Sequence, residues 1–438
     1  MKKAFYAMFA VLGMYACSTM DEPQNPPTAS EKTELGAPMS VIRTPEEASA
    51  CAMEAFAHFY GTSRSVKIVK DVKPIASRTM GRSAAADTSY YIVNLEDNEG
   101  YAVIAADRRY PNTILAVTEK GNVEHPDSID NPGAAMFFEG LDYAINGNFE
   151  RDCTPIDSST IILPNPDWSG GDINPWLDTP QYKWETTTQT YSVEPRVPFN
   201  WGQIYPEGVY FKNKKSGCGT TASVLLLSYF EIPRYISSDK FGFKKVDWSL
   251  IKEHKRSYSI ELNYELPLKE PADEALAELC YELGKRNNSV CHKDGTSTNI
   301  ENVRSALLEF RTLGFNPRPI CAEMPRAYYH LGDGVIYVRG ETDKGEGHAF
   351  IVDGYKHVVI TRTQYKREPR AAEWYAVDKK QSVDSYNHIN WGWCGADNGY
   401  FLISVFDTSK AEEYDNGTTT IEHYKYTKKF KYFVVTKN

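Results

Sequence analysis

The stretch that decides the fold is Ser216-Gly217-Cys218-Gly219-Thr220-Thr221-Ala222, at the start of an apolar run that extends to Phe230. The run predicts a buried helix with Cys218 at its N-terminus. There the unpaired N–H groups and the positive end of the helix dipole favour the thiolate, the nucleophilic form of cysteine. Gly217 and Gly219 would let a substrate backbone approach the sulfur closely. A single cysteine opening an apolar helix is more often an inert core residue, so the interpretation depends on the rest of the chain.

The first supporting segment is Gly345-Glu346-Gly347-His348, which is followed by the apolar residues 349–353. These residues predict a short strand, closed by a turn at Gly354, with His348 where the strand leaves a glycine-rich loop. An imidazole at this position can take the proton of a thiol and later return it to a leaving amine. His348 lies about 130 residues after Cys218, a spacing found in papain-like peptidases.

Two further segments complete the pattern. The segment His388-Ile389-Asn390-Trp391-Gly392-Trp393 contains two indoles, and an indole beside a histidine shields the imidazole from water. Gln203, in Trp201-Gly202-Gln203, carries a side-chain amide that can donate to an oxyanion opposite the backbone N–H of the nucleophile. The order Gln, Cys, His, Asn-Trp-Gly along one chain is a stronger signal than any of these residues alone.

With these motifs the chain resembles the streptopain family of papain-fold cysteine peptidases, over most of its length from about residue 44 to residue 405. The members of this family are secreted as zymogens with a long N-terminal pro-domain. The resemblance implies that Cys218 is the nucleophile and His348 the general base and acid. It also implies that Gln203 is the oxyanion-hole donor and that Trp391 flanks the histidine.

The group that orients the imidazole is left open by the sequence. Ile389 stands where papain has an orienting asparagine. We therefore expect either Asn390 or a backbone carbonyl near Trp391 to take this role. The resemblance further implies contacts with substrate in the loops around the site, at residues Gly217, Ser297, Gly347 and Trp393.

The N-terminus predicts export. Lys2 and Lys3 precede an apolar segment from Ala4 to Ala16 that is too short to span a membrane and is typical of a secretory signal. Cys17 follows a small residue, as in a relaxed bacterial lipobox, so we expect residues 1–17 to be a lipoprotein signal peptide with Cys17 as the lipidation site. Ordinary signal cleavage with an incidental cysteine is the alternative. The protein would then be an outer-membrane or cell-surface lipoprotein held by its lipid anchor, or otherwise secreted or periplasmic.

The remaining chain divides into four regions. The polar, Pro-rich residues 18–43 predict a flexible tether. Residues 44–151 show a capping box at Thr44, a hairpin over 90–106, a strand over 114–118 and a helix over 134–145, and they are similar to the pro-domain of the streptopain family. This similarity implies an intramolecular inhibitor, whereas an independent binding or spacer domain is the alternative. Residues 152–197 predict an irregular linker that contains the processing site.

Residues 198–438 are long enough for a papain-like catalytic domain of two subdomains, so the fold class is α+β. Two helices are expected there as scaffold, one from Ala272 to Leu283 ended by Gly284, and one opened by a capping box at Thr298 and running to Leu313.

Composition excludes some classes of function. The net charge is −9, from 49 basic and 58 acidic residues without a long like-charge block, which argues against a nucleic-acid partner. No Cys-x-x-Cys occurs, so neither a structural zinc nor another cofactor is expected. Two functions remain. One is a cysteine endopeptidase zymogen that hydrolyses protein or peptide substrates, and the other is a catalytically silent surface binding protein with the same fold.

Overall fold

The computed structural model of the chain describes most residues between 40 and 437, and residues 41–438 form one compact unit. The described residues are 40–61, 67–76, 88–110, 112–145, 161–162, 180–255, 268, 270–341, 347–406 and 430–437. The predicted signal peptide, Cys17 and most of the predicted linker lie outside them. Helices and strands are both abundant, as predicted for an α+β fold. No helix in the described ranges is long and apolar enough to cross a membrane.

The N-terminal domain, residues 41–145, contains the helices and strands that were predicted for it, and strand β1, which was not predicted. Helix α1 (Pro45–Tyr60) begins with the predicted capping box, in which the Glu47 N–H donates to Thr44 and the Thr44 N–H donates to the Glu47 carboxylate. Gly61 ends the helix with a φ of 78°. The domain continues with β1 (Val69–Ala76), β2 (Thr88–Leu95), β3 (Tyr101–Ala105), β4 (Ile114–Thr118) and α2 (Pro132–Tyr143).

Helix α2 begins two residues before the predicted start because Asn131 caps it. The Asn131 side chain accepts from the backbone N–H groups of Gly133 and Ala134, and Pro132 occupies the first helical position. A cap of this kind satisfies N–H groups that the first helical turn leaves unpaired.

The C-terminal part, from residue 180 onward, begins with strand β6, which is followed by five α-helices among the described residues. They are α4 (Cys218–Phe230), α5 (Trp248–Ile251), α6 (Pro271–Arg286), α7 (Ile300–Leu308) and α8 (Ala327–His330). Its strands beyond the short β5 (Ile161–Ile162) are β6 (Gln181–Val193), β7 (Tyr235–Ser238), β8 (Gly242–Lys245), β9 (Val290–Cys291), β10 (Thr296–Ser297), β11 (Phe315–Pro317), β12 (Val335–Glu341), β13 (Gly347–Arg367), β14 (Tyr375–Asn390), β15 (Gly399–Leu402) and β16 (Lys431–Lys437).

The predicted bounds of two helices are wrong. Helix α6 runs through Gly284 instead of ending there, because this glycine allows close packing: a Cβ at position 284 would lie 2.6 Å from the Phe211 ring. Helix α7 is capped by Asn299 and not by Thr298, and it ends at Leu308 before a separate 3₁₀ turn over Arg311–Leu313.

Most of the described strands form one large sheet with the order β1-β2-β3-β4-β15-β14-β13-β12-β16-β11, and β6, which pairs with β5, joins it at β13. Strands β7 and β8 pair separately from this sheet, and so do β9 and β10. Successive side chains along β12 and β13 alternate between two buried clusters, as strand geometry requires. Tyr337 and Ile351 pack with helices α4, α6 and α7 in one cluster, whereas Val338 and Phe350 pack in the other cluster, which includes α1 and α2. The middle of the sheet is therefore covered on both faces.

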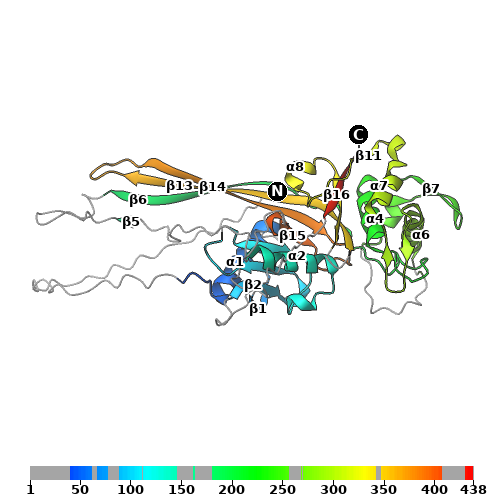
Figure 1. The fold of residues 1–438 in the computed structure, drawn as a ribbon, viewed down its shortest axis with the longest axis horizontal. Coiled ribbons are helices and arrows are strands. Elements are labelled where there is room, and N and C mark those ends of the chain that lie inside the picture. Colours follow the sequence, from blue (N-terminus) through cyan, green and yellow to red (C-terminus); the bar gives the residue numbers. More distant parts are fainter. Residues whose placement is uncertain are drawn as a thin grey trace, which may run out of the picture. The chain divides into compact units, whose positions relative to one another are not determined.

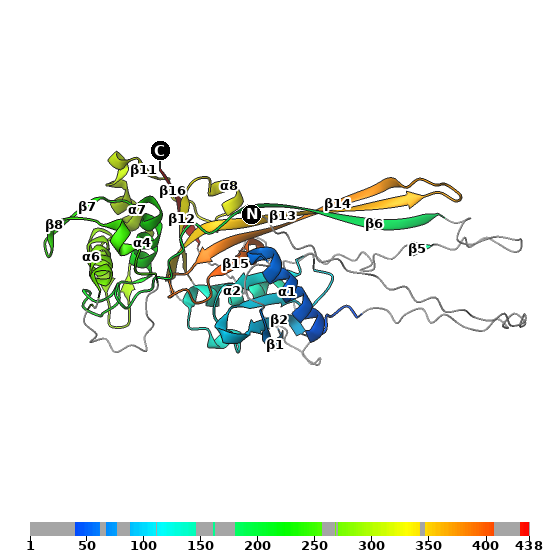
Figure 2. The same cartoon turned by 180° about the vertical axis from the view of Figure 1, so that it is seen from behind.

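A long three-stranded arm extends from this sheet (Figures 1 and 2). Strand β13 continues past Gly354, where we predicted a turn, and pairs with β14 on one side and β6 on the other. The prediction of a strand ending at residue 353 is wrong, and so is that of an irregular linker over 181–193. Both segments are extended because each supplies the backbone hydrogen bonds of the other.

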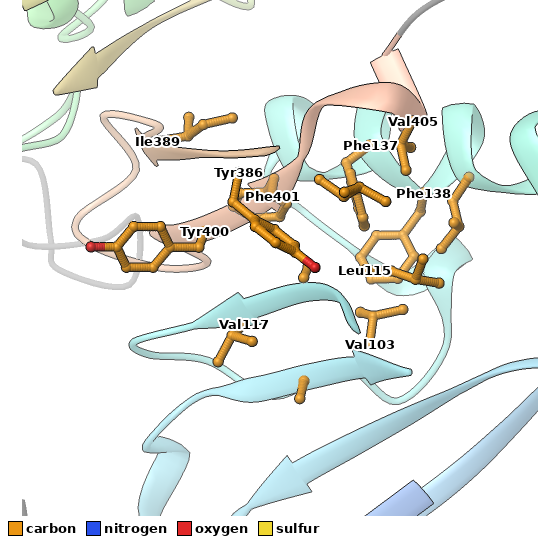
Figure 3. Close-up of a cluster of buried hydrophobic side chains, with 14 of the residues drawn as sticks. Val103, Leu115, Val117, Phe137, Phe138, Tyr386, Ile389, Tyr400, Phe401 and Val405 are labelled. Atoms are coloured by element: carbon orange, nitrogen blue, oxygen red, sulfur yellow. The ribbon is translucent and has the colours of Figure 1, made fainter. Parts of the chain in front are cut away.

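The N-terminal domain is joined to the C-terminal part by strand pairing and by a shared core. Strand β4 pairs antiparallel with β15, with Val117 opposite Tyr400. Figure 3 shows the core at this junction, where side chains of β3, β4 and α2 meet those of β14 and β15. Phe137 of α2, for example, lies with its ring centroid 5.0 Å from that of Phe401. This junction positions α2 against the segment that follows β14.

Candidate active site

Cys218 is the first residue of α4, as predicted. Gly217 precedes it with a φ of 82°, a conformation that favours glycine, and a Cβ there would lie 2.4 Å from the backbone oxygen of Thr296. Because Gly217 has no side chain to cap the helix, the N–H groups of the first turn remain available to an anion.

The imidazole of His348, at the start of β13, lies close enough to the thiol of Cys218 to affect its ionisation. Burial by itself raises the pKa of this thiol. The hydrogen bond to His348, the charge of the imidazolium, the backbone N–H of Ala349 and the positive charge of Arg339 outweigh burial, so that the net pKa is lowered from its usual value. This is the environment that favours a thiolate.

The orientation of His348 is set by a backbone carbonyl. Nε2 of His348 lies 2.8 Å from the oxygen of Trp391. A carbonyl oxygen only accepts, so Nε2 carries a proton, and Nδ1 is the nitrogen left to face Cys218. Of the two orienting groups that the sequence left open, the structure places the carbonyl, and not the amide of Asn390, against the ring.

Asn390 contacts the other end of the same peptide group. The N–H of Gly392 donates to Oδ1 of Asn390 at 3.1 Å, and Nδ2 of Asn390 donates to the oxygen of Phe199 at 2.9 Å. Asn398, which the sequence did not single out, accepts from the Trp391 N–H at 3.0 Å. The buried amides of Asn390 and Asn398 thus hold the backbone on both sides of Trp391.

Trp391 is fully buried beside the histidine. Its indole N–H donates to the backbone carbonyl oxygen of Asp397 at 3.0 Å. Its ring lies 4.6 Å from the Phe350 ring and 6.5 Å from the His348 ring, centroid to centroid. Gly133 of α2 lies against the same ring: a Cβ there would come within 2.2 Å of Cε3 of Trp391. The N-terminal domain therefore contacts the aromatic wall of the site directly.

Gln203 is held close to the start of α4 by its backbone. Its carbonyl accepts from the N–H of Ser216 at 2.8 Å, and the hydroxyl of Thr221 donates to the Gly202 carbonyl at 2.7 Å. Trp201 anchors the segment, since its buried indole N–H donates to the His254 oxygen at 2.7 Å. The backbone of Gln203 is thereby fixed against Ser216, two residues before Cys218, and its side chain is half-buried.

The four residues expected to contact substrate lie in loops or at strand ends around the site. Trp393 presents its ring edge-on to His348 at 6.1 Å, centroid to centroid. Gly347 is exposed at the start of β13, immediately before the histidine. Ser297 is exposed in β10, next to the Thr296 that packs on Gly217, and its hydroxyl lies 2.9 Å from Nε2 of His292.

Arg339 is a residue of the site that the sequence analysis missed. It extends from β12, where its guanidinium donates to the Thr298 oxygen at 2.7 Å and pairs with Glu341 at 2.7 Å. Its charge contributes to the lowered pKa of Cys218. No sequence signal distinguishes it from other strand arginines, because its role depends on the pairing of β12 with β13.

Asn131 is the second missed residue. Besides capping α2, it donates to the Ala396 oxygen and to Oδ2 of Asp397, both at 3.2 Å, and so ties the N-terminal domain to the loop after Trp391. Within the described residues no group of three or more His, Cys, Asp or Glu side chains comes together as a metal site would require.

Comparison with known proteins agrees with this geometry. Residues 194–401 match the model of the peptidase C10 family, and residues 40–145 match that of the Spi protease inhibitor. No curated protein and no solved structure matches the chain. Residues 194–401 therefore belong to the peptidase C10, or streptopain, family, and they are preceded by an N-terminal domain of the protease-inhibitor type.

Proposed function

We propose that the protein is the zymogen of a cysteine endopeptidase that cleaves protein substrates through a Cys218–His348 dyad. The observation that carries this proposal is that His348 lies beside Cys218 at the uncapped N-terminus of α4 and lowers the pKa of its thiol. The helices that include α4 would form one papain-like subdomain and the sheet that carries His348 the other, with substrate bound between them.

The chemistry follows from these positions. The Cys218 thiolate attacks the peptide carbonyl and forms a carbon–sulfur bond, while the carbonyl electrons move to its oxygen. The resulting oxyanion accepts from the Cys218 N–H and the Gln203 amide. His348 then gives its Nδ1 proton to the leaving amine as the tetrahedral intermediate collapses to an acyl-enzyme. Water, deprotonated by the same nitrogen, hydrolyses the thioester and restores the thiol.

The Trp391 carbonyl would keep the imidazole in the reactive tautomer throughout this cycle. Asn390 is then a positioning residue that acts on the Trp391–Gly392 peptide group instead of on the ring. The buried indole of Trp391 excludes water from the hydrogen bond between His348 and this carbonyl, and a hydrogen bond is stronger in such a dry environment.

The N-terminal domain would act as the intramolecular inhibitor. Its helix α2 places Gly133 against Trp391 and Asn131 against the loop that follows, so the domain covers one wall of the site. Cleavage in the region between the two domains would release it. The sequence further supports export with Cys17 as a lipid anchor, which would place the enzyme on a membrane surface.

The experiment follows the mass of the purified chain from residue 18 onward in reductant with casein present, for the parent and for Cys218→Ala. We expect the parent alone to shorten and to degrade casein, because both reactions need the thiolate. A separate protease that removes the N-terminal domain is used in a second run. Casein left intact by the trimmed parent would contradict the proposal and support the silent binding protein.

A further inference from the structure

Two acidic side chains of the C-terminal part are buried where the N-terminal domain docks. Asp384 of β14 is 7 % exposed and Asp397, in the loop between β14 and β15, is 8 % exposed. A buried carboxylate is normally compensated by a cation. Among the described residues no lysine, arginine or histidine forms an ion pair with either carboxylate, and both meet uncharged groups of the N-terminal domain instead.

Asp384 meets Asn112, which precedes β4. The buried amide of Asn112 donates to Oδ1 of Asp384. On β14 the titratable neighbour of Asp384 is Tyr386, whose hydroxyl donates to the backbone oxygen of Ile114 at 2.9 Å. On the adjacent strand β13, the apolar Val358 lies opposite Asp384. Burial raises the pKa of Asp384 to about 6, although the hydrogen bond from Asn112 and the nearby hydroxyl of Tyr386 favour the ionised form.

Asp397 meets Asn131, which caps α2. The amide of Asn131 donates to Oδ2 of Asp397 at 3.2 Å. The titratable groups that face it come from the N-terminal domain: Tyr101 of β3 and Asp130, which precedes α2. Burial raises the pKa of Asp397 to about 6, and the negative charge of Asp130 adds to this rise, whereas contacts with Asn131 and Tyr101 oppose it.

Two histidines lie at the same junction but behave differently. Burial lowers the pKa of His388, yet Asp353 and Glu119 more than compensate and raise it to about 10, so His388 keeps its charge across the physiological range. Burial and the charge of Lys356 lower the pKa of His58, so protonation of His58 in acid weakens docking and opposes the effect of the carboxyl groups. Variants must therefore be compared with the parent at the same pH.

We propose that Asp384 and Asp397 form a pH-dependent latch that holds the N-terminal domain tightly in acid and releases it more readily at neutral pH. When the domain lifts, water reaches both carboxyl groups and their pKa returns to the usual value near 3.9. The docked state therefore binds more protons than the released state between about pH 4 and pH 6. Docking is strongest below this window and weakens as pH rises through it.

The size of the effect follows from the two pKa shifts. A difference of about two pKa units changes the ratio of docked to released domain by roughly 100-fold for each carboxyl group. This latch regulates the active site only if the N-terminal domain is the inhibitor proposed above, but its pH dependence is a property of the contact alone. It can thus be measured in a chain that has no activity.

The experiment measures amide hydrogen exchange in the full chain carrying Cys218→Ala, so that self-cleavage is absent. Peptides that cover β4 and β15 report on release of the N-terminal domain, because these strands pair with each other. After correction for the intrinsic pH dependence of exchange, we expect their protection to fall by at least 10-fold from pH 4.5 to pH 7.5. Asp384→Asn and Asp397→Asn, which keep the shape but stay neutral, should each restore protection at least 10-fold at pH 7.5 and change little at pH 4.5.

Asp378→Asn is the matched control, because Asp378 lies on the same strand as Asp384 but is exposed. It should leave the pH profile unchanged. Should a buried variant fold poorly, Asn112→Ala provides a second test: water then reaches Asp384 in the docked state, so protection at pH 4.5 falls and the pH dependence becomes shallower. Protection in the parent that is constant or rises between pH 4.5 and pH 7.5 would overturn the latch, whatever the peptidase activity proves to be.

Discussion

Replacement of Gly133 by alanine tests how the N-terminal domain blocks the site. The added methyl group would lie 2.2 Å from Cε3 and 2.7 Å from Cζ3 of Trp391, and 2.9 Å from Cδ2 of His348. Carbon atoms in contact are normally at least about 3.5 Å apart, so helix α2 must move away from the indole by about 1.3 Å. The indole cannot move aside, because it is fully buried and its N–H donates to the backbone carbonyl of Asp397.

Overpacking of this kind costs about 1–3 kcal/mol, and the higher helix propensity of alanine returns up to about 1 kcal/mol. A net loss of about 1–2 kcal/mol in docking raises the fraction of released domain roughly 5- to 30-fold. If release limits self-processing, the Gly133→Ala chain should process itself faster by the same factor. The assay is the rate of appearance of the mature form at fixed chain concentration, measured by intact mass.

The mature enzyme provides the control for this prediction. Residue 133 belongs to the domain that is removed, so mature forms from the parent and from Gly133→Ala have the same sequence and must have the same kcat/KM. Processing at the parental rate, in a variant whose circular dichroism shows a folded chain, would refute the claim that α2 lies on Trp391 in the zymogen.

Three further predictions concern the same machinery. His348→Gln should raise the pH at which Cys218 reacts half-maximally with iodoacetamide, because the interactions with His348 that lower the pKa of the thiol are lost. An unchanged midpoint would show that His348 does not act on the Cys218 thiol. Gln203→Ala should lower kcat by roughly 10²–10³-fold with little change in KM, as loss of an oxyanion donor does, and a pure KM effect would argue against that role. The mature form should begin before Gln181, since β6 pairs with β13 along its whole length and a peptidase needs unpaired backbone; an N-terminus within 181–193, read by mass spectrometry, would contradict this.

The local signals in the sequence were sufficient for much of the fold. The capping box at Thr44 predicts α1, the hairpin residues predict β2 and β3, and the apolar run after Cys218 predicts α4, as observed. In each case the residues that determine the element are neighbours in the chain. Asn131 is an exception at short range, because a cap three residues before the apolar pattern carries a weaker signal than the pattern itself.

The arm could not be predicted from its residues. Beyond residue 358 none of the described side chains of β13 is buried, so the strand lacks the alternation of apolar and polar residues that a half-buried strand shows. Strand β6 contains the run Thr186 to Thr190, which reads as a loop in isolation. These segments are strands because β6, β13 and β14 pair with one another, and pairing between distant segments is not visible in a local pattern.

The sequence also left the orienting group of His348 undecided, for a physical reason. A backbone carbonyl has no sequence signature, and its direction depends on how the loop after β14 folds. That loop is fixed by Asn398, which accepts from the Trp391 N–H, and by Asn390, which accepts from the Gly392 N–H. Arg339 was missed for a similar reason, since only the pairing of β12 with β13 brings it near the site.

The central claim is that Cys218 forms a covalent acyl-enzyme once the N-terminal domain is removed. The most direct measurement is the intact mass of the processed chain, quenched in acid during turnover of a peptide ester, followed by mapping of the modified residue. The account predicts one acyl group per chain on Cys218, with none in Cys218→Ala and far less in the unprocessed chain. Turnover of the ester without any acyl group on Cys218, or with the acyl group on another residue, would contradict it.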